Sequence, residues 1–282
     1  VFDAIRVDNP AQTIDDLGLY VSDQISWRNW RFTAGLRYDE LENDNGALVQ
    51  DDSETSISAA VLYSFDNGLS PYLNYAESFE TVVGQTLAGD ALEPERASQV
   101  EAGIKYEPRG FPGYFTVAWF DIEITNLPNP NSLPGDAAQQ QGQSTLSGLE
   151  LEGNFELGDF TVQLAYSTLD AEDPNGFALA ASPDGQASAW VTWAPMALQG
   201  FHAGAGLRWV GESTSENGSL RYVTPDYFLG DLMLGYEMSN GVDLALNVRN
   251  VTDEEYLTSC LTRGDCFPGL RRQVNASVTY SF

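Results

Sequence analysis

Apolar and polar residues alternate along most of this chain with a period of two. The C-terminal segment shows the pattern clearly, since Val274, Ala276, Val278, Tyr280 and Phe282 alternate with polar residues. Such alternation is typical of a β-strand with one apolar and one polar face. The apolar face meets a core in a soluble sheet and lipid in a membrane barrel, so this segment alone fits both.

Thirteen segments alternate in this way, and most are near the ~10-residue length of a transmembrane β-strand. The pattern predicts strands over residues 16–27, 29–39, 55–66, 69–80, 97–108, 114–125, 144–157, 159–169, 187–195, 201–211, 226–238, 242–251 and 271–282.

The connections between these segments alternate between short and long. The short ones are residues 28–29, 66–68, 109–113, 158–159, 195–200 and 239–241. The long ones are residues 39–54, 81–95, 126–143, 170–186, 211–225 and 252–270. Outer-membrane barrels have this asymmetry, with short periplasmic turns and longer extracellular loops. A soluble β-sandwich, the alternative, has no reason to sort its loops by length.

Charged and aromatic positions also favour the barrel. Charges on the polar faces would be costly in a dry sandwich core, but they cost little against a water-filled or plugged lumen. They are Glu101, Lys105, Glu150, Glu152, Arg208, Asp231 and Arg249. Aromatic residues near strand ends are typical of interfacial girdles, although such residues also staple hairpins. They are Trp27, Trp30, Tyr38, Phe65, Tyr72, Tyr106 and Phe201. We therefore predict an all-β, antiparallel transmembrane β-barrel.

Composition excludes several other classes of protein. No run of 18 apolar residues occurs, which argues against transmembrane helices. Acidic residues outnumber basic ones by 41 to 13, and the net charge of -28 argues against a nucleic-acid partner. The one histidine, His202, lies near a predicted short turn, far from the loop end where a Ser–His–Asp triad would need it. We predict neither an enzyme nor a bound cofactor.

Acidic runs at residues 39–46 and 50–54 supply the carboxylate oxygens that calcium prefers. A solvated loop is the commoner origin of such runs, and we favour it here.

The odd strand count indicates part of a larger barrel, or a count that is wrong by one. Single-chain bacterial barrels close with an even number of antiparallel strands. Residues 1–16 resemble a long loop with no strand before it.

Five stretches resemble the C-terminal part of TonB-dependent outer-membrane receptors, specifically the ferric-siderophore receptors close to the ferrichrome receptor. They are LGLYVSDQISWRNWRFTAGLRYD, YLNYAESFE, LEPERASQVEAGIKYEP, SGLELEGNFEL and LALNVRNVTDEEYLTSCLTRGDCFPGLRRQVNASVTYSF. The resemblance implies a 22-stranded barrel filled by an N-terminal plug domain. Residues 1–282 are then the last thirteen strands, without the plug and the first strands. The TonB complex acts only through that plug, so we expect no active uptake by this chain alone.

The resemblance also implies a place in the bacterial outer membrane, among lipid and lipopolysaccharide. The barrel-assembly machinery would read an assembly signal in Phe282, Tyr280 and Val278. The transported ligand would be a ferric siderophore. The acidic balance disfavours anionic catecholate chelates and favours the hydroxamate type. A passive porin, or a receptor for another large nutrient such as a cobalamin or a glycan, is the alternative.

We expect ligand contacts from inward-facing residues near the loop rim. The candidates are Arg37, Tyr75, Phe79, Arg208, Trp209 and Arg249.

Cys260 and Cys266 stand close together in the last predicted long loop. Their spacing fits a disulfide in an oxidising compartment. A metal site fits less well, because no histidine or second cysteine pair lies nearby. The resemblance implies the disulfide, since related receptors have such a pair in their last extracellular loop.

Overall fold

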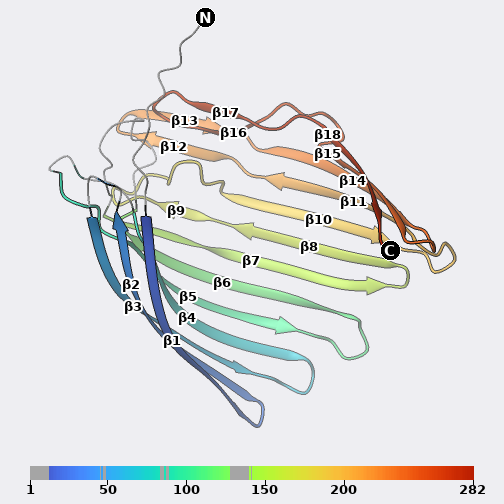
Figure 1. Cartoon of the computed structure of the whole chain (residues 1–282), viewed down its shortest axis with the longest axis horizontal. Helices are drawn as coiled ribbons and strands as arrows, with labels where there is room; N and C mark the ends of the chain where they lie inside the picture. Colours follow the sequence, from blue (N-terminus) through green and yellow to red (C-terminus); the bar gives the residue numbers. More distant parts are fainter. Residues whose placement is uncertain are drawn as a thin grey trace, which may run out of the picture.

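The computed structural model describes residues 13–44, 46, 49–82, 86, 89–127, 140 and 142–282. Within these ranges, thirteen strands follow one another in chain order as a single curved antiparallel sheet (Figure 1). The strands are β1 (Thr13–Trp27), β2 (Trp30–Asp44), β3 (Val49–Tyr63), β4 (Leu69–Glu80), β5 (Glu95–Tyr106), β6 (Gly113–Thr125), β7 (Gln143–Leu157), β8 (Phe160–Thr168), β10 (Gly185–Trp193), β11 (Phe201–Val210), β14 (Tyr227–Glu237), β15 (Val242–Arg249) and β18 (Gln273–Tyr280). No helix among the described residues is long and apolar enough to cross a membrane.

All thirteen predicted strands are present, and the all-β antiparallel fold is confirmed. One predicted loop is wrong. Most of residues 39–54 belong to β2 and β3, which stay paired from Asp39–Glu54 out to Asp44–Val49. The prediction failed because this part of the ladder is polar on both faces. Backbone pairing continues there without an apolar face to mark it.

Five short strands inside the long connections were not predicted. β9 (Asp170–Glu172) pairs with β7, while β12 (Ser213–Asn217) with β13 (Leu220–Thr224), and β16 (Leu257–Cys260) with β17 (Cys266–Pro268), form two separate hairpins. Segments of three to five residues are too short to show periodicity.

The sheet has tight turns at one end and long connections at the other, as predicted (Figure 1). Two of the turns use the same device. Gly68 and Gly200 adopt φ of 91° and 82°, and their carbonyls accept hydrogen bonds from the amides of Glu107 and Glu237. A Cβ on either glycine would lie 2.0 Å from a backbone oxygen of the neighbouring strand end. Only glycine permits this approach.

Strand register divides the side chains between two faces. On one face apolar residues stand opposite one another, as in the pairs Phe32–Val61 and Leu36–Ile57. On the other face Arg37 and Asp39 form an ion pair. Outer-membrane barrels are apolar toward lipid and polar toward the lumen, so we assign the first face to lipid and the second to the lumen.

In β18, Val274, Ala276 and Val278 pair with Val248, Leu246 and Leu244. These six residues share the lipid face, as predicted for the C-terminal strand.

Aromatic side chains border the lipid face at the short-turn end. Trp30 and Tyr63 meet with ring centroids 4.7 Å apart, and Trp193 and Phe201 with centroids 5.9 Å apart. Tyr72 does not belong to this girdle, contrary to expectation. Its ring lies beside Gly103 on the lumen face, and its hydroxyl donates to Glu101.

A second aromatic border lies at the loop end, where the rings keep their polar atoms bonded. The Tyr38 and Tyr75 hydroxyls donate to Glu40 and Glu77 at 2.9 and 2.7 Å. Eight residues separate Trp30 from Tyr38, about 26 Å along a strand and ~20 Å along the membrane normal at a 40° tilt. This approaches the ~25 Å apolar band of outer-membrane barrels.

The faces predict effects of different size for two adjacent substitutions in β15. In the whole receptor, Leu246→Arg should destabilise the folded barrel by about 2–4 kcal/mol, since it places a cation in hydrocarbon. Asn247→Arg, on the lumen side, should change stability by less than ~1 kcal/mol. Urea titration in lipid vesicles measures both. Equal effects would contradict the assignment of faces.

Candidate ligand-binding wall

A polar cluster lies on the lumen face where β11, β14 and β15 reach the loop end. Arg208 forms two hydrogen bonds with Asp231, at 2.7 and 3.0 Å. Both nitrogens of the guanidinium edge face the carboxylate, a strong and directional geometry. The Arg208 side chain keeps 46% of its surface exposed while Asp231 keeps 15%, so the pair presents the cation to the lumen.

Backbone pairing explains how two distant residues meet. Asp231 stands directly opposite Gly206, two residues before Arg208 on the same strand. Because Gly206 has no side chain, the diagonal neighbour Arg208 reaches the carboxylate unobstructed.

Asn250 connects this ion pair to the last long loop. It is 2% exposed and has a φ of 52°, a left-handed conformation that asparagine tolerates better than most residues. Its amide N–H donates to Asp231 at 2.9 Å. Its side chain donates to the carbonyls of Glu254 and Leu270 and accepts from the Glu254 amide. One buried residue therefore holds both ends of the loop against the wall.

Two tyrosines extend the cluster toward the loops. Tyr227 and Tyr256 pack with ring centroids 4.2 Å apart. They line a cleft of about 720 Å³ together with Asp226, Glu254 and Arg271. Arg271 also bonds Asp253 in the same loop, at 2.7 Å. The guanidinium of Arg271, with the Arg272 amide, lowers the pKa of Asp253 and keeps this loop carboxylate ionised.

A second depression, of about 520 Å³, lies beside Arg208 along β7, β8 and β10 and is lined in part by Glu150, Glu152 and Gln186. Glu152 accepts a hydrogen bond from Tyr114 at 2.9 Å. Farther along the wall, Lys105 lies over the Tyr72 ring, 5.3 Å from its centroid. The wall therefore offers hydroxyls, carboxylates and a few cations to a hydrated ligand.

Three predicted ligand residues face the lumen and three do not. Arg37, Arg208 and Arg249 lie on the lumen face, and Arg37 is bound to Asp39. Tyr75 pairs with Ala59 and Val100 on the lipid face, and Phe79 follows it in the same ladder.

Trp209 also lies on the lipid face, where it pairs with Ala187 and donates to Asp226 at 3.1 Å. The inward orientation expected for Tyr75, Phe79 and Trp209 is therefore wrong. Aromatic residues occur on both faces of these strands, so residue type did not reveal the face.

Tyr227 and Tyr256 were not predicted as wall residues. Tyr227 shares its strand face with Asp231, a signal that alternation contains. Tyr256 follows no periodic segment, and only the folded loop brings it to Tyr227.

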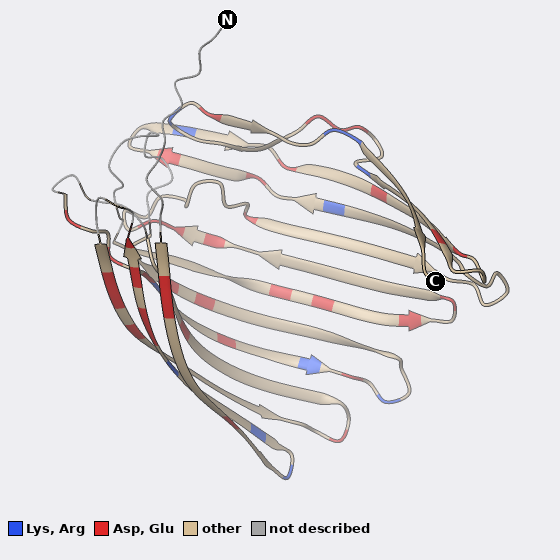
Figure 2. Cartoon of the chain, in the orientation of Figure 1, with Lys and Arg blue, Asp and Glu red and all other residues tan. Residues whose placement is uncertain are grey.

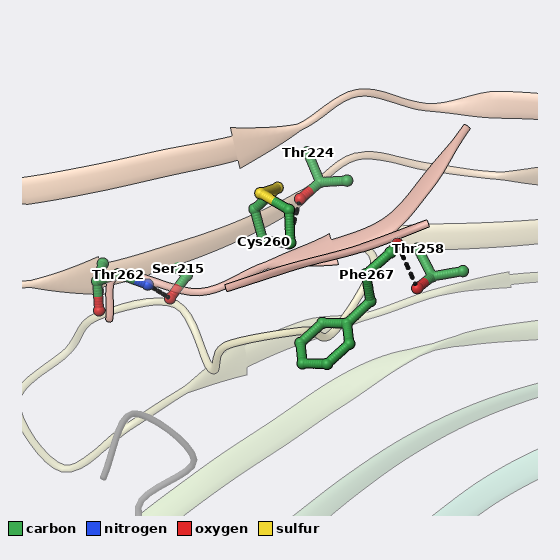
Figure 3. The surroundings of a disulfide bond; sticks show 7 residues. Ser215, Thr224, Thr258, Cys260, Thr262 and Phe267 are labelled. Atoms are coloured by element: carbon green, nitrogen blue, oxygen red, sulfur yellow. Dashed lines mark hydrogen bonds between the residues drawn. A yellow bond between two sulfur atoms is a disulfide. The ribbon is translucent and has the colours of Figure 1, made fainter. Parts of the chain in front are cut away.

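The disulfide is present between Cys260 and Cys266, with an S–S distance of 2.05 Å (Figure 3). The Cys260 amide donates to the Thr224 hydroxyl at 2.8 Å, and the Thr262 amide to the Ser215 hydroxyl at 3.1 Å. These buried bonds join the β16–β17 hairpin to the β12–β13 hairpin. The disulfide thus closes one of two hairpins that brace each other above the wall.

Acidic residues gather at the loop end of β1, β2 and β3 (Figure 2). In the part of the chain that the structure describes, no group of three or more His, Cys, Asp or Glu residues could hold a metal ion. Residues 45, 47 and 48, at the tip of the acidic β2–β3 connection, lie outside the described residues.

Comparison with known proteins identifies the family. The family model described as TonB dependent receptor-like, beta-barrel, matches residues 2–251. The chain belongs to this family, and we place it in the bacterial outer membrane. The Ferrioxamine B receptor of Salmonella typhimurium is 35% identical over 94% of the chain. The Ferrichrome outer membrane transporter/phage receptor of Escherichia coli K12 is 31% identical over 94%.

Solved structures agree on the fold. One match is the receptor FpvA of Pseudomonas aeruginosa, bound to a pyoverdine–iron complex, with a TM-score of 0.79 and 23% sequence identity. The match covers 96% of this chain and 39% of the FpvA chain. The chain spans 40% of the Salmonella relative's length and 38% of the Escherichia coli relative's.

Replacing Asn250 should loosen the loop without unfolding the sheet. Asn250→Ala removes the partners of three backbone groups, and each buried group left unsatisfied costs about 1–3 kcal/mol. We expect faster amide hydrogen exchange across residues 250–271 and unchanged exchange in β5 and β6. Asn275→Ala, an exposed lumen-facing residue of β18, is the control. Unchanged exchange in the loop would show that Asn250 does not anchor it.

Removing the disulfide should have a local effect. A ring this short contributes about 2 kcal/mol through loop-closure entropy. The double variant Cys260→Ser, Cys266→Ser should therefore be cleaved faster by protease within residues 257–268. The wild type treated with reductant should behave like the variant. Cleavage at the wild-type rate would contradict the prediction.

Proposed function

We propose that this chain is the C-terminal barrel portion of a TonB-dependent receptor that imports ferric siderophores. In the whole receptor a plug domain and the first barrel strands complete the structure. The observation that best supports this proposal is the lumen-facing cluster at the loop end of the sheet, formed by Arg208, Asp231, Tyr227 and Tyr256. It lies where a ligand entering from outside would first meet the wall.

The chemistry of the cluster supports a bulky chelate as ligand. Stacked tyrosines offer apolar area together with hydroxyls, a combination common at binding surfaces. Arg208 adds guanidinium N–H donors, and its partner Asp231 orients them toward the lumen. Such a wall binds and positions a ligand without breaking a bond, which agrees with transport rather than catalysis.

We further propose a hydroxamate siderophore as the ligand. Two relatives named above are receptors for ferrioxamine B and ferrichrome. The net charge of -28 would repel anionic ferric catecholates and tolerate neutral or cationic chelates. The siderophore is cargo, and the TonB complex would act on the plug.

The test is ligand binding by the whole receptor. Tyr256→Ala, which removes one of the stacked rings, should weaken ferrioxamine B binding about tenfold, as expected for ~1.4 kcal/mol. Arg208→Gln should weaken it by a similar factor. Quenching of tryptophan fluorescence measures the affinity, and Tyr75→Phe on the lipid face is the matched control.

Unchanged affinity in both lumen variants would contradict the site. Iron-siderophore uptake that does not depend on the TonB complex would instead favour a passive porin.

A further inference from the structure

One carboxylate lies on the lipid face, within the apolar band. On β2 and β3 the lipid-facing positions between the aromatic borders are uncharged, whereas β1 carries a carboxylate there. There Asp23 stands on the lipid face, four residues from Trp27 and four from Leu19. Four residues correspond to about 13 Å along a strand, or ~10 Å of depth at a 40° tilt. Asp23 is therefore close to the middle of the band.

The strand register places the Asp23 side chain on the lipid face. Asp23 stands opposite Ala34, between the pairs Val21–Leu36 and Ile25–Phe32. A slip of β1 by one residue would bring Ser22, Gln24 and Ser26 into lipid, so the ladder keeps Asp23 on the lipid face.

Asp23 has no partner on the side of β2. Ala34 and, beyond it, Ala59 have only methyl groups. Among the described residues, no hydrogen bond or ion pair involves the Asp23 carboxylate. A charge facing hydrocarbon alone is costly, so a compensating group is expected on the other side of β1.

The other side of β1 is a free sheet edge within the described structure. Hydrocarbon cannot satisfy its backbone groups, so another strand must pair there. β18 cannot do so in an antiparallel sheet, because β1 and β18 both run from the loop end to the short-turn end (Figure 1). The neighbour is therefore a strand outside the described residues.

We propose that this neighbouring strand carries a lysine or arginine on its lipid face, directly opposite or diagonal to Asp23. Cross-strand neighbours in an antiparallel pair lie within ~8 Å, which a long basic side chain spans. Its methylenes cover apolar surface while its head group meets the carboxylate. The pair removes two isolated charges from the lipid face and specifies the register of this junction. The inference depends on the barrel and not on the ligand.

The sequence of the whole receptor gives the first test. The strand that pairs with β1 must have a lysine or arginine at one of the three lipid-facing positions nearest Asp23. A strand with only uncharged residues there overturns the proposal.

Stability in lipid vesicles gives the second test. Asp23→Asn and Asp23→Leu in the whole receptor should each lower the equilibrium constant for folding at least tenfold, because each leaves a cation unpaired in hydrocarbon. Higher or unchanged stability of Asp23→Leu would show that the carboxylate faces lipid unpaired. Glu42→Gln, a lipid-side carboxylate of β2 beyond the loop-end aromatics, should have no effect.

A third test separates the neighbouring strand from a second copy of the receptor. In an Asp23→Cys variant, a second cysteine at the basic position should form a disulfide within one molecule. Covalent dimers formed by Asp23→Cys alone would assign the contact to a second copy and overturn the proposal.

Discussion

Hydrocarbon offers backbone N–H and C=O groups no hydrogen-bonding partner, and the rest of this structure depends on that constraint. Every strand between the ends of the sheet is paired on both sides along one continuous ladder. The pairing is local in the chain, because each strand meets the next through a hairpin. Short turns therefore accumulate at one end and long connections at the other, and this sorting separates the membrane-embedded wall from the loops.

Once the backbone is paired, side chains have only two directions available. Between the aromatic borders of β1 to β3 the lipid face excludes charge, with Asp23 as its exception, and the loop-end tyrosines keep their hydroxyls bonded. The lumen face is free to hold ion pairs and hydroxyls. Arg208, Asp231 and the loop residue Asn250 form one connected network there, so the wall and the last long loop are positioned by the same hydrogen bonds. The disulfide and the two hairpins brace that loop from above.

The chain belongs to the TonB-dependent receptor family, and the proposed function explains this arrangement. In the proposed receptor, this wall, below braced loops, would hold the cargo until it is pulled inward. The part of the barrel described here contributes the wall and loops, and gating belongs to a plug domain in the proposed whole receptor.

Alternation in the sequence by itself determined the thirteen strands, the sorting of the connections and the orientation of β18, because a period of two maps directly onto the two faces of a strand. Where polarity is the same on both faces, as in residues 39–44, that signal disappeared and only the ladder revealed the strand. Residue type alone did not separate Tyr75 and Trp209 from true wall residues, since aromatic rings suit both a membrane interface and a binding wall. The contact between Tyr227 and Tyr256 was decided by tertiary structure, because a loop has no period and its position depends on distant hydrogen bonds through Asn250.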